Sequence, residues 1–345
     1  MAYRAAVVGA AGYAGAELLR LLAGHPDVAV TRAVAASHAG SAVTDLYPAL
    51  APAYRGLVLD AWDPAALDGV DVAFLTLPHG ESQRLVPDLL GRVGHVIDLG
   101  ADFRLPAARY EQWYGTPHTA PALLGSFAFG LPELFRDRLT ADAGVAVPGC
   151  YPTAAILALA PLLTGGLASP EGVVVHAASG VSGRGRGLSD PSLFSEANET
   201  VTPYGLLTHR HTGEIDWALS ELTGVPVAAL FTPHLVPMTR GLLASCYARP
   251  AAEGLTTGRL LDAYHAQYDD EPFIVVGAAP PTTRATLGSN AAHLTARYDD
   301  RTGSLLAFAA IDNLGKGAAG QAIQAANRVL GLPEATGLPA VGIVP

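Results

Sequence analysis

The most nucleophilic side chain in proteins, the cysteine thiolate, can form at only two positions of this chain, Cys150 and Cys246. Cys150 lies within residues 148–153, where an apolar strand is expected to end and an apolar helix to begin, and Pro152 suits a first helical turn. The amides and the dipole of a helix N-terminus favour the thiolate. The alternative is a small buried hydrophobe, which Cys246 fits because it lies inside an apolar run. Position therefore favours Cys150 as a nucleophile.

Two histidines could supply the proton transfers that a thiol nucleophile needs. His209 and His211 lie just before an expected amphipathic helix, where an imidazole tends to stay neutral and can act as a base. Glu214, three residues after His211, could orient or polarise its ring. A solvated polar loop is the alternative. A zinc site has less support, because no third ligand is evident from the spacing, and we predict no metal.

A glycine-rich turn follows the first apolar strand and opens the first helix, in the pattern G-x-x-G-x-x-G. Glycines there permit a tight turn and let a pyrophosphate approach the helix N-terminus. A plain strand-to-helix turn is the alternative, but this position favours dinucleotide binding. The residues expected to contact the dinucleotide are Gly9, Ala11, Gly12, Tyr13, Ala14 and Gly15.

The second strand is expected to end near residues 35–38, where an NAD site usually places an acidic side chain on the ribose 2′-hydroxyl. No Asp or Glu lies there. Ser37, with Arg32 or His38 nearby, could instead receive a 2′-phosphate, so NADP(H) is favoured over NAD. The alternative is that the strand ends two or three residues away.

Arginines in two further loops could bind anionic groups. Residues 179–187 form a glycine-rich segment after an expected strand and contain Arg184 and Arg186. Residues 100–104 end in Arg104 after another strand. Guanidinium groups suit bidentate recognition of carboxylate or phosphate. The alternatives are a flexible loop and a solvated surface pair.

Alternating short β-branched and helical segments fill the first part of the chain, from Tyr3 to Val147, which predicts parallel βαβ units. The expected strands are residues 5–8, 28–35, 57–59, 70–77, 93–99 and 145–147, with a helix at 13–23.

After Cys150 the strands are longer and fewer helices separate them, which predicts a mixed or antiparallel sheet in a second, α+β domain. The expected elements are a helix at 153–163, strands at 172–178, 225–230, 241–248 and 273–276, a hairpin of 291–298 and 304–311, and a last helix at 317–330.

Length and composition narrow the class of protein. At about 150 residues per domain, 345 residues predict two domains, each with its own core. A net charge of −10 argues against a nucleic-acid binder with a basic face. Two cysteines are too few for a disulfide framework, and no export signal precedes the first strand, so we expect a cytoplasmic protein. No apolar run reaches the ~20 residues of a membrane span.

Together these motifs resemble the N-acetyl-gamma-glutamyl-phosphate reductase family, which is related to the aspartate-semialdehyde dehydrogenases. The latter usually have Asn beside the catalytic cysteine, whereas this chain has Gly149 and Tyr151, which favours the acetylglutamyl branch. The resemblance rests on residues 9–15, 77–80, 100–104, 130–133, 148–153, 179–186, 209–215, 232–237 and 312–321, in the family's order.

The resemblance implies an α/β fold with an N-terminal Rossmann dinucleotide-binding domain at residues 1–149. An α+β substrate and oligomerisation domain with a mixed sheet would span residues 150–312. The C-terminal helix, at about 313–330, would pack back on the first domain, although periodicity alone would leave it in the second. A homo-oligomer, dimer or tetramer, is expected through the sheet of the substrate domain.

The implied reaction is NADPH-dependent reduction of N-acetyl-gamma-glutamyl phosphate, through a thioester on Cys150, to N-acetylglutamate 5-semialdehyde and phosphate in arginine biosynthesis. His211 would move the proton and His209 would contact substrate, or the two roles are exchanged. Arg104 would hold the leaving phosphate and Arg186 the substrate carboxylate. Further expected cofactor contacts are Pro78, His79, Gly80, Ser179, Gly180, Gly183 and Asn313.

Two alternatives to this function stay open. One is a related acyl-phosphate or semialdehyde dehydrogenase that acts on aspartyl phosphate. The other is a redox sensor that binds NADP without turnover. Such a sensor needs the glycine turn but no thiolate and histidine pair.

Overall fold

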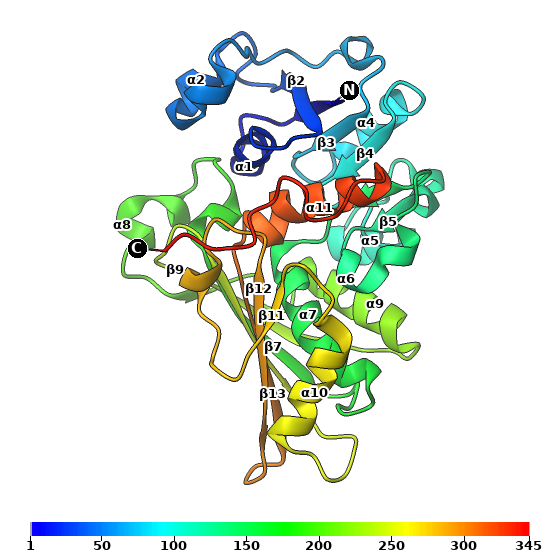
Figure 1. Ribbon diagram of the computed structural model, residues 1–345, viewed down its shortest axis with the longest axis vertical. Coiled ribbons are helices and arrows are strands. Elements are labelled where there is room, and N and C mark those ends of the chain that lie inside the picture. Colours follow the sequence, from blue (N-terminus) through cyan, green and yellow to red (C-terminus); the bar gives the residue numbers. More distant parts are fainter. Residues whose placement is uncertain (1, 345) are drawn as a thin grey trace. The chain divides into compact units, whose positions relative to one another are not determined.

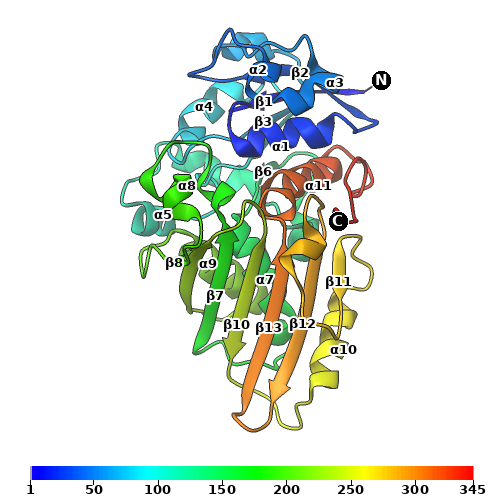
Figure 2. The same ribbon diagram turned by 90° about the vertical axis from the view of Figure 1, so that its left-hand side faces the viewer.

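The computed structural model describes residues 2–344, which divide into two compact units. The first comprises the chain up to Pro148 together with Ala318–Leu338, and the second comprises Gly149–Gly317 and the segment from Pro339 onward. Figure 1 colours the chain along its sequence, and Figure 2 shows the same ribbon after a quarter turn.

The first unit is a six-stranded, fully parallel sheet in the order β2-β1-β3-β4-β6-β5 with helices on both faces. Its strands are β1 Tyr3–Val8, β2 Val28–Val34, β3 Val72–Leu75, β4 His95–Asp98, β5 Phe127–Phe129 and β6 Gly144–Ala146. Its helices are α1 Tyr13–Leu22, α2 Val43–Leu46, α3 Ala51–Tyr54, α4 Ser82–Leu89, α5 Ala107–Tyr114, α6 Pro132–Phe135 and α11 Gly320–Val329.

Alternation along β1 divides the core of this unit into two layers. Ala5 and Val7 join the layer that contains α1 and α11, whereas Ala6 and Val8 join the layer that contains α4. Such alternation follows from the two-residue period of a strand. Figure 2 shows α1 and α11 side by side. The last helix of the chain thus completes the core formed by the first strand and helix.

The second unit is a seven-stranded mixed sheet in the order β11-β12-β13-β10-β7-β9-β8. The pairs β11/β12 and β7/β9 are parallel, and the other pairs are antiparallel. Its strands are β7 Val173–Gly180, β8 Thr202–Pro203, β9 Ala229–Val236, β10 Leu242–Ala248, β11 Ile274–Val276, β12 Ala292–Asp299 and β13 Ser304–Ile311. Its helices are α7 Cys150–Thr164, α8 Phe194–Ala197, α9 His211–Thr223 and α10 Thr257–Tyr268.

Three helices, α7, α9 and α10, cover one face of this sheet (Figure 1). The strand residues that point toward them are buried, including Cys246 on β10, and burial raises the pKa of its thiol to about 12. On the opposite face of β9 and β10 every second residue is partly or fully exposed, including Leu230 and Tyr247. The predicted fold class, a parallel α/β sheet plus an α+β unit with a mixed sheet, is confirmed.

Several predicted elements were wrong in detail. Residues 57–59 form no strand; within them only Val58 forms an isolated bridge, to Ala42. The predicted strand 225–230 lies too early, because residues 225–228 follow the left-handed cap Gly224 and the ladder begins at Ala229. The last helix begins at Gly320 rather than 317, after a π-helical turn at Gly315–Ala319. Sequence reasoning missed β5, which has three residues, and α10.

No helix within residues 2–344 has both the length and the apolar character needed to cross a lipid bilayer.

A buried histidine joins the start of the first unit to its end. His25 Nδ1 accepts from the amides of Asp27 and Val28 at 3.1 and 3.0 Å, and its Nε2 lies 3.0 Å from Asn327 Oδ1. Because Nδ1 accepts, Nε2 must donate, so the ring is neutral. Burial lowers the pKa of His25 below its ordinary value. Asn327 in turn donates to the carbonyls of Glu334 and Thr336.

This geometry predicts that His25 makes the first unit less stable as pH falls. The unfolded histidine binds a proton with a pKa near 6.5, whereas the folded ring resists protonation, so its contribution is present above that pH and declines below it. We expect H25Q to cost about 1–3 kcal/mol of unfolding free energy near neutral pH. The cost should shrink as pH falls, measured by urea denaturation of H25Q and wild type. H265Q, on the exposed face of α10, is the control; a pH-independent cost for H25Q would contradict this account.

Candidate active site

Cys150 is the first residue of α7, a helix of 15 residues whose N-cap, Gly149, has no side-chain hydrogen bond. Cys150 is half-buried and forms no disulfide, in contrast to the fully buried Cys246. The thiol therefore lies where the first amides and the dipole of a long helix favour the negative charge. This placement gives Cys150 the environment of a reactive cysteine.

His211 is the first residue of α9, and its ring lies against Gly149. A Cβ atom at position 149 would be 2.4 Å from His211 Nε2, so only glycine lets the imidazole come this close to the start of α7. Glu214 is fully buried, and its Oε2 accepts from the amide of Gly149 at 3.0 Å. Its Oε1 is 3.9 Å from His211 Nε2. Glu214 thus connects the N-termini of the two helices beside the thiol.

His209 lies next to His211 but has a different electrostatic environment. Its Nδ1 accepts from the amide of His211 at 3.2 Å, so in the neutral ring Nε2 carries the proton. Burial and the neighbouring His211 lower the pKa of His209 to about 3. A ring that stays neutral can donate a hydrogen bond through Nε2 but does not cycle through imidazolium near neutral pH. This favours His211 for proton transfer. No group of three or more metal-ligating side chains occurs among residues 2–344.

Two tyrosines complete this cluster, and the sequence reasoning missed them as site residues. The Tyr204 hydroxyl donates to the Tyr151 hydroxyl at 3.1 Å, which donates to the carbonyl of His234 at 3.1 Å. Burial raises the pKa of Tyr151 well above its ordinary value and that of Tyr204 to about 12, so both keep their protons. The guanidinium of Arg184 lies 5.8 Å from the centre of the Tyr204 ring. Tyr151 was signalled only by its position beside Cys150, and Tyr204 by no motif.

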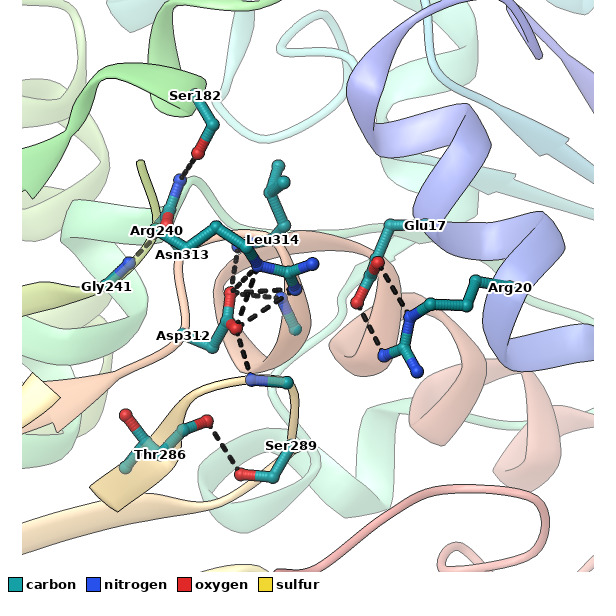
Figure 3. A network of polar contacts seen from close by, with 12 residues as sticks. Glu17, Arg20, Ser182, Arg240, Gly241, Thr286, Ser289, Asp312, Asn313 and Leu314 are labelled. Carbon is teal, nitrogen blue, oxygen red and sulfur yellow. Dashed lines mark hydrogen bonds and ion pairs between the residues drawn. The ribbon is translucent and has the colours of Figure 1, made fainter. Parts of the chain in front are cut away.

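The predicted glycine-rich loop begins where β7 ends, at Ser179 and Gly180. Gly180 passes so close to residues 238 and 239 that a Cβ atom would lie 2.8 Å from both carbonyl oxygens. The Asn313 side chain accepts from the amide of Gly241 at 2.8 Å and donates to Ser182 Oγ at 2.9 Å (Figure 3). The structure thus brings Asn313 together with the loop that contains Ser179, Gly180 and Gly183. Arg186, farther along this loop, is exposed.

In the first unit, the glycine turn has the geometry that a dinucleotide site requires. Gly9 has a φ of +91°, and a Cβ atom there would lie 2.5 Å from the carbonyl oxygen of Thr76. A Cβ atom on Gly15 would lie 2.5 Å from the carbonyl oxygen of Gly9. Gly12 is the N-cap of α1, with no side-chain cap and no acidic residue in the first turn. The helix N-terminus around Ala11, Tyr13 and Ala14 therefore suits a pyrophosphate.

The end of β2 lies one residue before its predicted position, at Val34. Ser37 is exposed, and its hydroxyl lies 2.9 Å from His38 Nδ1. Arg32 faces Asp60 at 3.9 Å, which makes it a weaker candidate for a 2′-phosphate. Ser37 and His38 thus form the polar pair after β2.

A second pair of predicted loops is joined by the buried carboxylate of Asp102. It accepts from the amides of Gly80 and Gln83 at 2.7 and 3.0 Å. Because β3 and β4 are parallel neighbours, the loop with Pro78, His79 and Gly80 lies beside the loop that ends in Arg104. Arg104 is 7% exposed and donates to the carbonyl of Leu99 at 2.7 Å. The structure thus brings Arg104 near one set of the expected cofactor contacts.

Comparisons with known proteins show to which family the chain belongs. Residues 4–141 match the semialdehyde dehydrogenase NAD-binding domain, and residues 150–313 match the semialdehyde dehydrogenase dimerisation domain. A protein of Symbiobacterium thermophilum called N-acetyl-gamma-glutamyl-phosphate reductase is 49% identical over 100% of this chain and 99% of its own. The chain belongs to this reductase family. A relative of the same name from Desulforudis audaxviator is 46% identical, over 98% of this chain and 99% of its own.

Solved structures show that the chain has the fold of the aspartate-semialdehyde dehydrogenases. The structure of aspartate semialdehyde dehydrogenase II from Vibrio cholerae, complexed with ASA, has a TM-score of 0.72 at 17% identity and covers 96% of this chain and 98% of its own. The Candida albicans enzyme with NADP has a TM-score of 0.67 at 14% identity and covers 96% and 99%. At these identities the similarity establishes the fold.

The contact between Gly149 and His211 predicts that Gly149→Ala lowers the reactivity of the Cys150 thiol. The new methyl group must push the imidazole away from the start of α7. We expect alkylation of Cys150 by iodoacetamide near neutral pH to slow by about tenfold or more, measured by peptide mass spectrometry. Gly56→Ala, whose Cβ meets no atom within 4 Å, is the matched control. Equal alkylation rates for G149A and G56A would show that the histidine does not influence the thiol.

Proposed function

We propose that this protein reduces N-acetyl-gamma-glutamyl phosphate with NADPH, giving N-acetylglutamate 5-semialdehyde and phosphate, as a step of arginine biosynthesis. The observation that carries the proposal is the arrangement at the start of α7. Cys150 begins this helix, His211 lies against Gly149, and Glu214 connects the two helices. Relatives that match almost the whole length of the chain are called N-acetyl-gamma-glutamyl-phosphate reductase, the name of the enzyme that catalyses this reaction.

In the first half of the reaction, the Cys150 thiolate attacks the acyl carbon of the substrate. A carbon–sulfur bond forms, the carbon–oxygen bond to phosphate breaks, and the electron pair leaves with the phosphate. The product on the protein is a thioester. His211 is placed to take the thiol proton before attack, with Glu214 orienting its ring.

In the second half, the thioester carbon on Cys150 is reduced to a thiohemiacetal. Bound NADPH supplies the hydride for this step. The carbon–sulfur bond then breaks, the semialdehyde leaves, and the sulfur departs as thiolate, which the N-terminus of α7 stabilises. His211 supplies a proton to the thiohemiacetal oxygen and recovers it on collapse. His209, held neutral, donates a hydrogen bond to the substrate.

Arginines would hold the anionic parts of the substrate. We assign Arg104, which is nearly buried, to the leaving phosphate, and the exposed Arg186 to the substrate carboxylate. A buried guanidinium recognises phosphate strongly because solvent does not screen it. Both arginines can form bidentate hydrogen bonds with their target groups.

The first unit would hold NADP(H). The N-terminus of α1 suits the pyrophosphate, and Ser37 with His38 would receive the 2′-phosphate. The remaining contacts would come from the loop with Pro78, His79 and Gly80, and from Ser179, Gly180, Gly183 and Asn313 of the second unit.

The outer face of the seven-stranded sheet supports a homo-oligomer. Leu230 and Tyr247 on this face are 53% and 39% exposed, on the unit that matches a dimerisation domain. A second copy of the chain would bury these apolar groups. A dimer or a tetramer satisfies this requirement, and a cytoplasmic location stays a prediction.

One assay tests reaction, substrate and cofactor together. N-acetylglutamate 5-semialdehyde is offered with phosphate and NADP⁺, and the appearance of NADPH is followed at its absorbance band. We expect reduction that depends on phosphate, with NADP⁺ preferred over NAD⁺. Faster turnover of aspartate semialdehyde would assign the protein to the related dehydrogenases, and NADP binding without any turnover would indicate a sensor.

The role of Cys150 predicts opposite outcomes for substitution of the two cysteines. Cys150→Ser should bind NADPH normally but lose essentially all turnover, because an alcohol near neutral pH is a far poorer nucleophile than a thiolate at a helix N-terminus. Cys246→Ser replaces a buried side chain on β10 and should keep the chemistry. Turnover and NADPH affinity of both purified variants measure this difference. Comparable losses of turnover in two folded variants would contradict the assignment.

The two histidines should differ in the pH profile of the reaction. His211→Asn should lower kcat by the ~10²–10⁴ typical of a lost acid/base group and remove one limb of the profile. His209→Asn should act mainly on KM and keep that limb, because the pKa of His209, about 3, lies outside the working range. Steady-state kinetics of both variants between mildly acidic and mildly basic pH measure the difference. If only H209N removes the limb, the two roles are exchanged.

A further inference from the structure

Residues 312–317 follow β13 and form a turn that begins with Asp312, a buried carboxylate to which the proposed reaction gives no role. We propose that the buried ion pair of Asp312 and Arg240 is a positioning element for the active site. The ion pair fixes this turn. The turn contacts Cys150 on one side and holds the glycine-rich loop on the other. The inference rests on the proposed function, because it gives this pair a role in the reactivity of the proposed nucleophile.

The carboxylate of Asp312 is fully buried and accepts hydrogen bonds from several directions (Figure 3). Arg240 donates to it through Nε and Nη2 at 3.0 Å. The amide of Gly288 donates to Oδ2 at 2.6 Å, and the amides of Leu314 and Gly315 donate to Oδ1 at 2.9 and 3.1 Å. One side chain therefore fixes the turn itself, the start of β10 and the segment before β12.

Two glycines let this turn run in direct contact with its neighbours. A Cβ atom on Gly315 would lie 2.2 Å from the carbonyl oxygen of Ser289. A Cβ atom on Gly317 would lie 2.8 Å from the Cβ of Cys150. The amide of Gly317 donates to the carbonyl of Asp312 at 2.9 Å, which closes the turn. The backbone that Asp312 holds is therefore in direct contact with Cys150.

The same turn holds the glycine-rich loop. Asn313, the residue after Asp312, connects Gly241 to Ser182 through its side-chain amide. Ser182 lies in the loop that contains Arg184 and Arg186. A shift of residues 312–313 would therefore move two things: the loop expected to contact the substrate, and the backbone of the turn beside the thiol.

The carboxylate is needed for its charge and for its two acceptor oxygens. In Asp312→Asn one oxygen becomes an NH₂ group. If it replaced Oδ2, it would face the donors of Gly288 and Arg240; if it replaced Oδ1, it would face the amides of Leu314 and Gly315. Either orientation places donor against donor and leaves the guanidinium of Arg240, 21% exposed, without its counter-ion. We expect the turn to move away from Cys150.

The test compares the reactivity of Cys150 in variants of the full chain. Its readout is the rate of alkylation by iodoacetamide at two pH values, near neutral and well above the ordinary thiol pKa, followed by peptide mass spectrometry. D312N and R240Q should slow alkylation near neutral pH by about tenfold or more, with a smaller effect at high pH, where the Cys150 thiol is ionised in each variant. R240K keeps the positive charge and should recover at least about threefold over R240Q.

Arg136→Gln is the matched control. Arg136 forms a partly exposed pair with Glu334 in the other unit, at 2.7 Å, so its loss reports the general cost of removing an ion pair. R136Q should alkylate at the wild-type rate. Thermal unfolding of each variant verifies that the alkylated protein is folded.

Folded D312N or R240Q protein that alkylates at the wild-type rate would overturn the inference. If D312N does not fold, the comparison of R240Q with R240K decides, and equal rates for these two would also overturn it. The alkylation uses no substrate, so its outcome is separate from the proposed function. Wild-type protein that fails to reduce N-acetyl-gamma-glutamyl phosphate would refute the function while leaving the thiol measurement intact.

Discussion

The candidate active site depends on one buried carboxylate that connects two helix N-termini. Glu214 is fully buried, a costly position for a charge unless hydrogen bonds compensate it. Its hydrogen bond to the amide of Gly149 and its proximity to the ring of His211 provide that compensation. The interaction also fixes which groups meet: a thiol at the start of α7 and an imidazole at the start of α9. This carboxylate acts together with the direct packing of α7 against α9.

The two units use close backbone approach in the same way. In the first unit, Gly9 and Gly15 allow the strand-to-helix turn to contact neighbouring backbone. In the second, Gly149 and Gly317 allow a ring and a turn to contact the residues around the thiol. At these positions a methyl group would meet another atom at 2.8 Å or less. The proposed sites therefore depend on glycines, which have no side chain, as well as on reactive side chains.

What the sequence could predict was mostly local. The glycine turn, the cysteine at a helix start and the hairpin of β12 and β13 are encoded by adjacent residues, and the structure contains all three. The predicted ends of strands were less accurate, because an apolar run such as 225–230 indicates burial but not which residues pair with a neighbouring strand. The expectation that the last helix packs on the first domain came from the family resemblance, because periodicity alone would leave this helix in the second domain. The roles of individual site residues stay predictions.

The contacts that escaped prediction join distant parts of the chain. Arg240 and Asp312 are 72 residues apart, and Tyr151 and Tyr204 are 53 apart. No local pattern of residue types marks such pairs, because the topology of the fold determines which distant residues meet. The pKa of His209 is a similar case, since burial and a neighbouring ring set it.

Lys316 lies in the turn that supports Cys150, and it is the only lysine of the chain. Its side chain is fully buried, with Nζ 5.9 Å from the centre of the Phe273 ring. Acyl phosphates acylate exposed amines, whereas arginine stays protonated and offers no comparable nucleophile. The one lysine amine of this chain is buried, and the basic side chains on its surface are guanidinium groups. The surface therefore offers an acyl phosphate no lysine side chain to acylate.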